Sequence, residues 1–156
     1  MINAELGHVN TLEEFHKEIV RQQTEAHGKH YCDHHAVIEK LASECQSYLE
    51  LGTHQGGTAS CAILQKFKHV QLVDIDMHRY RKFLQPIAED FSKNNKINLV
   101  VLEASSLDKK TTYNADLMLI DSVHNTKHMA KELAMHGNNI QKYILAHDTH
   151  RLFGKV

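Results

Sequence analysis

The stretch YLELGTHQGGTAS, residues 48–60, decides the fold interpretation. A short apolar run contains the acid Glu50 and is followed by Gly52 and then by the pair Gly56 and Gly57. This order is typical of a buried strand that turns into a helix through glycines, where a ligand can lie against bare backbone. The stretch carries no lysine, and a triphosphate-binding loop needs one after its last glycine. That class of nucleotide site is therefore excluded.

The rest of the chain alternates between strand and helix patterns. Residues 1–45 are predicted to be helical and to pack on the core formed by residues 46–156, because apolar residues recur at helical spacing. Thr11 and Glu14 form a capping box at the start of the first helix, and Pro86 is predicted to start a second helical segment. Predicted strands that are nearly continuous apolar runs, and so buried on both faces, cover residues 47–51, 69–76, 96–104, 115–122 and 141–148. The pattern predicts a single α/β domain with a doubly wound parallel sheet.

Composition excludes several function classes. The 156 residues carry a net charge of -1, so there is no basic excess of the kind that nucleic-acid binding needs. No apolar run reaches the roughly 18 residues of a membrane span, and the N-terminus has no apolar signal core. Three cysteines give no disulfide framework, which favours reduced thiols and a cytoplasmic location.

Two ligand classes remain for the glycine turn. A dinucleotide is disfavoured because an ionised Glu50 works against its pyrophosphate, and because no glycine stands between Gly52 and Gly56 at the middle position of the fingerprint. S-adenosylmethionine, which carries a sulfonium and an ammonium, suits an acid behind the turn. Asp74 follows at the end of the second strand, where an acid meets ribose hydroxyls. Asp76 is the alternative for that role.

Four motifs in order resemble the class I S-adenosylmethionine-dependent methyltransferases: LELGTHQGGTAS, VQLVDIDMH, ADLMLIDSVHNTKHMAKEL and YILAHDT. The similarity covers roughly residues 47–150 and is closest to the branch of cephalosporin-hydroxylase-like and macrolide-sugar O-methyltransferases. It implies a Rossmann-like sheet of strand order 3-2-1-4-5. In the implied cofactor site, the glycine turn lines the methionine part, Asp74 binds the ribose and two serines lie by the adenine. The cofactor-binding residues so implied are Glu50, Gly52, Thr53, Gly56, Asp74, Ser105, Ser106 and Asp121.

A second group of residues lies at the ends of the fourth and fifth predicted strands. Asp121 ends one strand, and His147 and Asp148 end the next, so the carboxylates should converge and repel unless a cation or proton lies between them. A divalent metal held by Asp121, His147 and Asp148 is one solution. The resemblance implies magnesium, whereas the imidazole favours a transition metal such as manganese. The candidate catalytic residues are Asp121 and His124, the latter as general base.

One further motif, HYCDHH at residues 30–35, matches no closed zinc pattern. The sequence also departs from the family that it resembles. Members normally add another helix and an antiparallel strand pair after the fifth strand, whereas this chain stops at Val156. The fifth strand is then predicted to be an apolar edge that a second copy covers, which gives a homo-oligomer.

The predicted function is S-adenosylmethionine-dependent, metal-assisted O-methyl transfer to a small hydroxylated acceptor. The alternatives are a non-catalytic S-adenosylmethionine-binding or structural module within a larger assembly, and a dinucleotide enzyme that uses the same turn.

Overall fold

The computed structural model describes residues 5, 6 and 8–148; residues 1–4, 7 and 149–156 lie outside that part. The outermost residues of the two predicted segments, 1–45 and 46–156, fall outside it, and the boundary between the segments stays a prediction.

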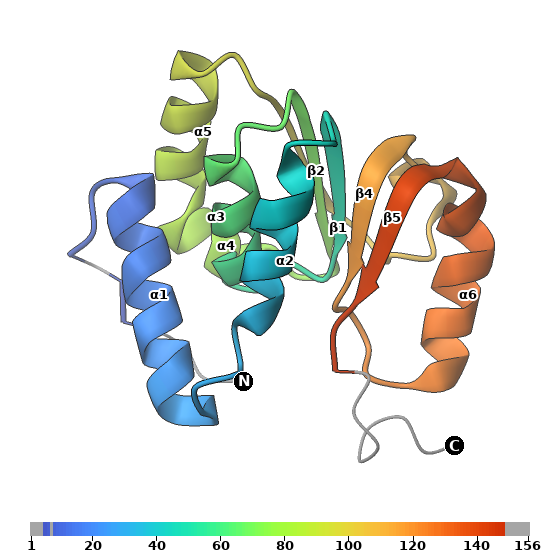
Figure 1. Cartoon of the computed structure of the whole chain (residues 1–156), viewed down its shortest axis with the longest axis horizontal. Helices are drawn as coiled ribbons and strands as arrows, with labels where there is room; N and C mark the ends of the chain where they lie inside the picture. The colour runs from blue at the N-terminus through green and yellow to red at the C-terminus, as the bar shows by residue number, and fades with distance from the viewer. Residues whose placement is uncertain (1–4, 7, 149–156) are drawn as a thin grey trace.

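The core of the molecule is one sheet of five parallel strands (Figure 1). The strands run in the order β3-β2-β1-β4-β5, and the predicted order is therefore confirmed. Their bounds are β1 Ser47–Leu51, β2 His69–Asp74, β3 Asn98–Glu103, β4 Ala115–Ile120 and β5 Ile140–Ala146. The chain order reverses direction between β1 and β4, and the carboxyl ends of these two strands form the crevice where ligands bind in such sheets.

Helices cover the two faces of the sheet unequally (Figure 1). One face carries the first five helices and the other carries α6. The helices are α1 Leu12–His27, α2 Asp33–Ala42, α3 Gly57–Leu64, α4 His78–Phe83, α5 Gln85–Asn94 and α6 Thr126–His136, with short 3-10 turns η1 Lys109–Thr111 and η2 Gly137–Asn139. The predicted break at Pro86 is confirmed, since Pro86 occupies the first turn of α5, where its missing N–H costs nothing.

The N-terminal helix α1 begins at the predicted capping box. The Thr11 side chain accepts a hydrogen bond from the Glu14 backbone, and the Glu14 side chain accepts from Thr11. Its apolar stripe buries Phe15 and Ile19 completely in the same cluster as Ile63 of α3. Each such side chain contributes about 1.5–3 kcal/mol by leaving water. This burial fixes α1 beside α3. Helix α2 also packs against α3, through Ile38.

Alternation along β1 divides the core into two clusters. Tyr48 belongs to the cluster under α1–α5, whereas Leu49 and Leu51 belong to the cluster under α6. The two edge strands are not buried on both faces as predicted: no residue of β3 is fully buried, and β5 carries only half-buried and exposed residues, with Ile144 41% exposed. Both differ from the other strands because each pairs with a single neighbour among the described residues, β3 with β2 and β5 with β4. No helix in the described part of the chain is long and apolar enough to cross a bilayer.

Candidate functional site

A cavity of about 230 Å³ lies beyond the carboxyl ends of β1, β2 and β4. Its walls come from the glycine turn after β1, the ends of β2 and β4, the loops after β3 and β5, α6, and the two N-terminal helices with their connection. The cavity therefore occupies the crevice that the sheet topology predicts.

The glycines of the turn have different tasks. A Cβ on Gly52, whose φ is +97°, would lie 2.1 Å from the carbonyl oxygen of Asp121, so only glycine lets the turn approach β4 this closely. Gly52 also lines the cavity. Gly56 is left-handed as well, but a Cβ there would meet Leu84 at 2.3 Å and the residue does not line the cavity. Gly57, which was predicted to open the helix but was not among the predicted cofactor-binding residues, lines the cavity in its place.

Glu50 lies below the floor of the cavity and is fully buried. Its Oε2 accepts a 2.6 Å hydrogen bond from the Tyr48 hydroxyl. Burial raises the pKa of Glu50 to about 8, although the Tyr48 hydrogen bond opposes that shift. Glu50 shares a face of β1 with Tyr48 because residues i and i+2 of a strand point the same way. Its carboxyl is therefore directed into the helical layer, and its predicted contact with the cofactor stays a prediction.

Asp74 connects the end of β2 to the glycine turn. One carboxylate oxygen, Oδ2, accepts hydrogen bonds from the backbone N–H groups of Thr53 at 2.8 Å and His54 at 2.7 Å. The other, Oδ1, accepts from the Asp76 backbone. Asp74 and Thr53 line the cavity, whereas Asp76 does not, so the structure places the first of the two ribose candidates at the site.

The two predicted adenine-side serines line the opposite end of the cavity. Ser105 Oγ accepts from the Leu107 backbone at 3.2 Å. Ser106 Oγ is hydrogen-bonded to Nε2 of His128 on α6 at 3.1 Å, and its carbonyl contacts Nε2 of His136 at 2.7 Å. These contacts fix the loop after β3 against α6.

Two carboxylates and two imidazoles converge on the rim of the cavity; we call Asp121, His124, His147 and Asp148 the rim cluster. His147 Nδ1 lies 3.2 Å from Asp121 Oδ1 and 3.3 Å from Asp148 Oδ1. His124 Nε2 lies 3.4 Å from Asp121 Oδ1, and its Nδ1 lies 3.3 Å from Asp148 Oδ2. The predicted convergence of the two strand ends is therefore seen in the structure.

Charge state in the rim cluster follows from these contacts. Burial raises the pKa of Asp121, but contacts with His124 and His147 outweigh it and hold the pKa at about 2. The contact with Asp121 in turn raises the pKa of both imidazoles above their ordinary value. Without a metal, the contacts between Asp121 and the two imidazoles thus favour the charged form of each of these three groups.

The donor set also fits a divalent cation. Asp121, His124 and Asp148 each offer one ligand atom, and these atoms lie within 4.8 Å of one another. The sequence assigned this role to His147 in place of His124; both rings contact both carboxylates. Carboxylate oxygens with one imidazole suit manganese, iron or zinc better than magnesium.

Part of the cavity wall escaped the sequence interpretation. Gln23 of α1, Tyr31 of the connection between α1 and α2, and His34 of α2 face the cavity, and the ring centroids of His34 and His147 lie 4.3 Å apart. His34 Nε2 is hydrogen-bonded to Thr58 Oγ1 at 2.8 Å. The motif HYCDHH, residues 30–35, was the one sequence feature that suggested a ligand-binding role for Tyr31 and His34. A local sequence pattern does not indicate whether these side chains face the cavity after folding.

No family model matches the chain, and no curated protein matches its sequence. Among solved structures, an O-methyltransferase family protein from Burkholderia thailandensis is similar over 83% of this chain at 11% identity, with a TM-score of 0.53. Burkholderia thailandensis 1,6-didemethyltoxoflavin-N1-methyltransferase is similar over 90% of this chain at 12% identity, with a TM-score of 0.45. The chain covers 38% of the first and 66% of the second, well under half of the first protein's length. The first likeness shows the fold, which is the Rossmann-like fold of a methyltransferase.

Proposed function

We propose that this chain binds S-adenosylmethionine in the cavity and transfers its methyl group to a small hydroxylated acceptor. The chemistry of the wall is the observation that carries the proposal. The cavity is lined by the backbone of Gly52 and Gly57 and by Asp74 and Asp121. Among the described residues, no lysine or arginine lines it. Such a wall disfavours phosphates and favours a ligand with positive charge.

Each part of the cavity has a role in this proposal. The glycine turn accommodates the methionine part. Asp74 accepts hydrogen bonds from the ribose hydroxyls, since carboxylate oxygens have lone pairs beyond those that the turn uses. Ser105 and Ser106 border the adenine end, and Glu50 supplies a titratable acid beneath the turn. When bound, the cofactor supplies an electrophilic methyl group on its sulfonium.

The rim cluster orients and activates the acceptor in this proposal. Asp121, His124 and Asp148 hold a divalent cation, which lowers the pKa of the acceptor hydroxyl. His147 keeps its hydrogen bond to Asp121, which leaves it placed to receive a proton at the cavity wall. In the alternative assignment the two imidazoles exchange roles. His147 then ligates the metal, and His124, whose side chain is 37% exposed, is the general base.

Single variants separate these two assignments. Loss of the imidazole that ligates the metal raises the metal concentration required for half-maximal turnover. Loss of the imidazole that acts as general base lowers turnover at saturating metal and flattens the pH dependence of turnover. His124→Gln and His147→Gln should therefore give different signatures. Identical effects of the two substitutions on both quantities would refute the division of roles.

Cofactor binding is tested by isothermal titration with S-adenosylmethionine and S-adenosylhomocysteine. Asp74→Asn keeps a side-chain oxygen that can accept the hydrogen bonds from the glycine turn but removes the negative charge. The substitution should weaken S-adenosylmethionine binding by about tenfold or more. The matched control is Asp76→Asn, because Asp76 is exposed and does not line the cavity. Equal binding by both variants, or displacement by NAD with equal affinity, would refute the proposed site.

A non-catalytic binding or structural module is the second candidate, and one observation favours it. The turn is held by its own contacts, through Gly52 against Asp121 and through Asp74 on two backbone N–H groups. Binding of the cofactor without methyl transfer to a panel of sugars and small phenols, with manganese or magnesium present, would support this second function.

We also propose a homo-oligomer in which a second copy covers β5. The outer edge of β5 has no strand partner among the described residues, and Ile144 is exposed beside it. Size-exclusion chromatography with light scattering should give a mass of at least twice 17.9 kDa. A monomer at micromolar concentration would contradict this.

A further inference from the structure

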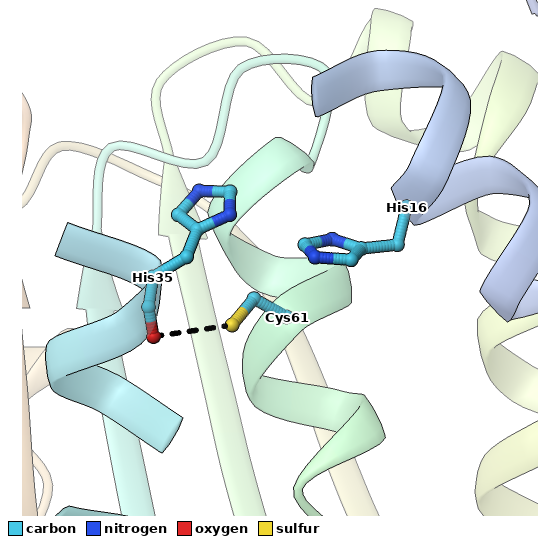
Figure 2. A group of neighbouring side chains, drawn as sticks. All are labelled: His16, His35 and Cys61. Carbon is cyan, nitrogen blue, oxygen red and sulfur yellow. Dashed lines mark hydrogen bonds between the residues drawn. The ribbon is translucent and has the colours of Figure 1, made fainter. Parts of the chain in front are cut away.

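A second group of potential metal ligands lies between three helices, and none of its members lines the cavity (Figure 2). His16 of α1, His35 of α2 and Cys61 of α3 each offer one ligand atom, and these atoms lie within 4.8 Å of one another. We call these three residues the interhelix cluster. His35 and Cys61 are buried, and His16 is half-buried.

One ligand atom of this cluster lacks a partner. His35 is 5% exposed, and its Nδ1 is buried without a hydrogen bond among the described residues. Figure 2 shows a ring nitrogen of His35 on the side that faces His16. A buried nitrogen without a hydrogen-bond partner destabilises the fold, and a bound cation would remove that cost.

Hydrogen bonds fix the other imidazole in a form that can ligate. Ser60 Oγ donates its proton to the Gly57 carbonyl at 2.7 Å, so it accepts from His16 Nδ1 at 2.9 Å. His16 Nδ1 then carries the proton and Nε2 keeps its lone pair. Metal-binding histidines usually donate their other ring N–H to a hydrogen-bond acceptor, and the Ser60 hydroxyl is such an acceptor here.

The protonation states agree with this arrangement. Burial lowers the pKa of His35 to about 3 and lowers the pKa of His16, so both rings are neutral at pH 7. Burial raises the pKa of the Cys61 thiol to about 12. The thiol is thus protonated when no metal is present, and a cation must displace its proton to form the metal–sulfur bond.

We propose that His16, His35 and Cys61 form a site for a thiolate-preferring transition-metal cation of the Zn²⁺ class. Thiolate and imidazole ligands select such cations over magnesium and calcium. Glu39, one helical turn after His35, acts electrostatically on both His16 and Cys61 and is the candidate for a fourth ligand. On binding, the cysteine S–H bond breaks, a sulfur–metal bond forms, and one proton passes to solvent.

The site would join three helices and thereby support the cavity wall. α1, α2 and the connection between them supply Gln23, His34 and Tyr31 to the cavity, and His34 is the direct sequence neighbour of the ligand His35. The His34 and His35 rings lie 4.5 Å apart, and both contact Thr58 Oγ1. A metal here fixes the position of α2 against α3.

The test uses Co²⁺ as an optical probe and Zn²⁺ as its competitor. The full chain, reduced and freed of metal by a chelator, should show a thiolate-to-cobalt absorption band that saturates at one Co²⁺ per interhelix cluster and that Zn²⁺ removes. Binding should release one proton, measured by titration calorimetry in buffers of different ionisation enthalpy. The band should be absent in Cys61→Ser, and His35→Gln should weaken binding by about 100-fold.

Three controls keep the outcome interpretable. Cys45→Ser removes another buried thiol and should keep the band. Asp148→Asn alters the rim cluster and should also keep it, since that cluster has no sulfur. If Cys61→Ser fails to fold by circular dichroism, His16→Gln, at a half-buried position, should still change the band and lower the affinity. Absence of a thiolate band in the parent protein, or a band that persists in Cys61→Ser, would overturn the proposal.

Discussion

The rim cluster and the interhelix cluster are built from similar side chains but differ in what surrounds them. In the rim cluster, Asp121 and Asp148 contact both imidazoles and raise the pKa of each. In the interhelix cluster, burial lowers the pKa of His16 and His35; Glu39 raises that of His16 without offsetting the burial, and neighbouring histidines lower that of His35 further. The difference teaches that histidine charge here depends on carboxylates within 4 Å more than on burial.

The difference also separates two kinds of metal chemistry. The rim cluster offers oxygen and imidazole donors at a solvent-accessible cavity, which suits a cation that meets a substrate. The interhelix cluster offers sulfur and imidazole donors between helices, which suits a cation that holds structure. Each prediction below breaks or sharpens this contrast.

The largest effect is expected from Gly52→Ala, because Gly52 lets β1 and β4 place Asp121 in the rim cluster. The added Cβ would overlap the Asp121 backbone at 2.1 Å and should cost more than about 3 kcal/mol in urea unfolding. Gly28→Ala is the control, since Gly28 has a similar φ of +105° but nothing within 4 Å. Its cost should stay near 1–2 kcal/mol. Equal costs would show that the contact between strand ends is not the constraint.

Acidification should affect the two clusters with opposite sign. His35 has a pKa of about 3 when folded and an ordinary value of 6.5, so its stabilisation is present above pH 6.5 and lost as pH falls. That loss is about 2 kcal/mol at pH 5. His147 has a raised pKa, so its contribution is complete below pH 6.5 and lost as pH rises through the folded pKa.

Unfolding free energies at pH 7 and pH 5 test this contrast. His35→Gln should reduce the loss of unfolding free energy between pH 7 and pH 5, whereas His147→Gln should increase that loss. Parallel curves for the two variants would contradict the opposite charge states.

Asp121→Asn should remove the cause of the raised imidazole pKa values. The substitution should cost about 1–2 kcal/mol at pH 6, because charged partners then face a neutral amide. The pKa of His147, followed by NMR of the ring nitrogens, should fall, while that of His35 should stay low. An unchanged His147 titration would show that Asp121 does not set it.

The smallest effect is expected from Cys61→Ala in metal-free protein. The side chain is a small buried group, so its loss should cost about 1 kcal/mol. Between pH 6 and pH 8 the cost should not change, because the thiol pKa lies near 12. A pH-dependent cost in this range, measured by thermal unfolding, would mean that Cys61 ionises without metal.

The rim cluster could be predicted from sequence because parallel strands end at one edge of a sheet. Asp121, His147 and Asp148 each follow a strand, and strand order alone makes β4 and β5 neighbours. The strand order itself followed from the alternating pattern together with the family resemblance. Residues at strand ends are thus the most predictable part of the site.

The interhelix cluster could not be predicted, because helix packing depends on contacts distant in sequence. His16, His35 and Cys61 belong to three helices whose relative rotation is fixed by Phe15, Ile38 and other buried residues. The HYCDHH motif offered a local pattern, yet only His35 of it joins the cluster. The burial of Glu50 could have been predicted from the sequence. Side chains alternate along a strand with a period of two, which places Glu50 on the same face of β1 as Tyr48, beneath the helices.

The pairing of β1 with β4 also has a consequence for folding order. The Gln46 backbone N–H donates to Asp116, which lies 70 residues later. Contacts between such distant positions require closing a long loop, which is entropically costly and slow. During synthesis, the half that ends with β3 can form its β1–β2–β3 pairings early, because these are sequential crossovers. The cavity, however, has no complete wall until β4 and β5 dock, because Asp121 and His147 follow these strands.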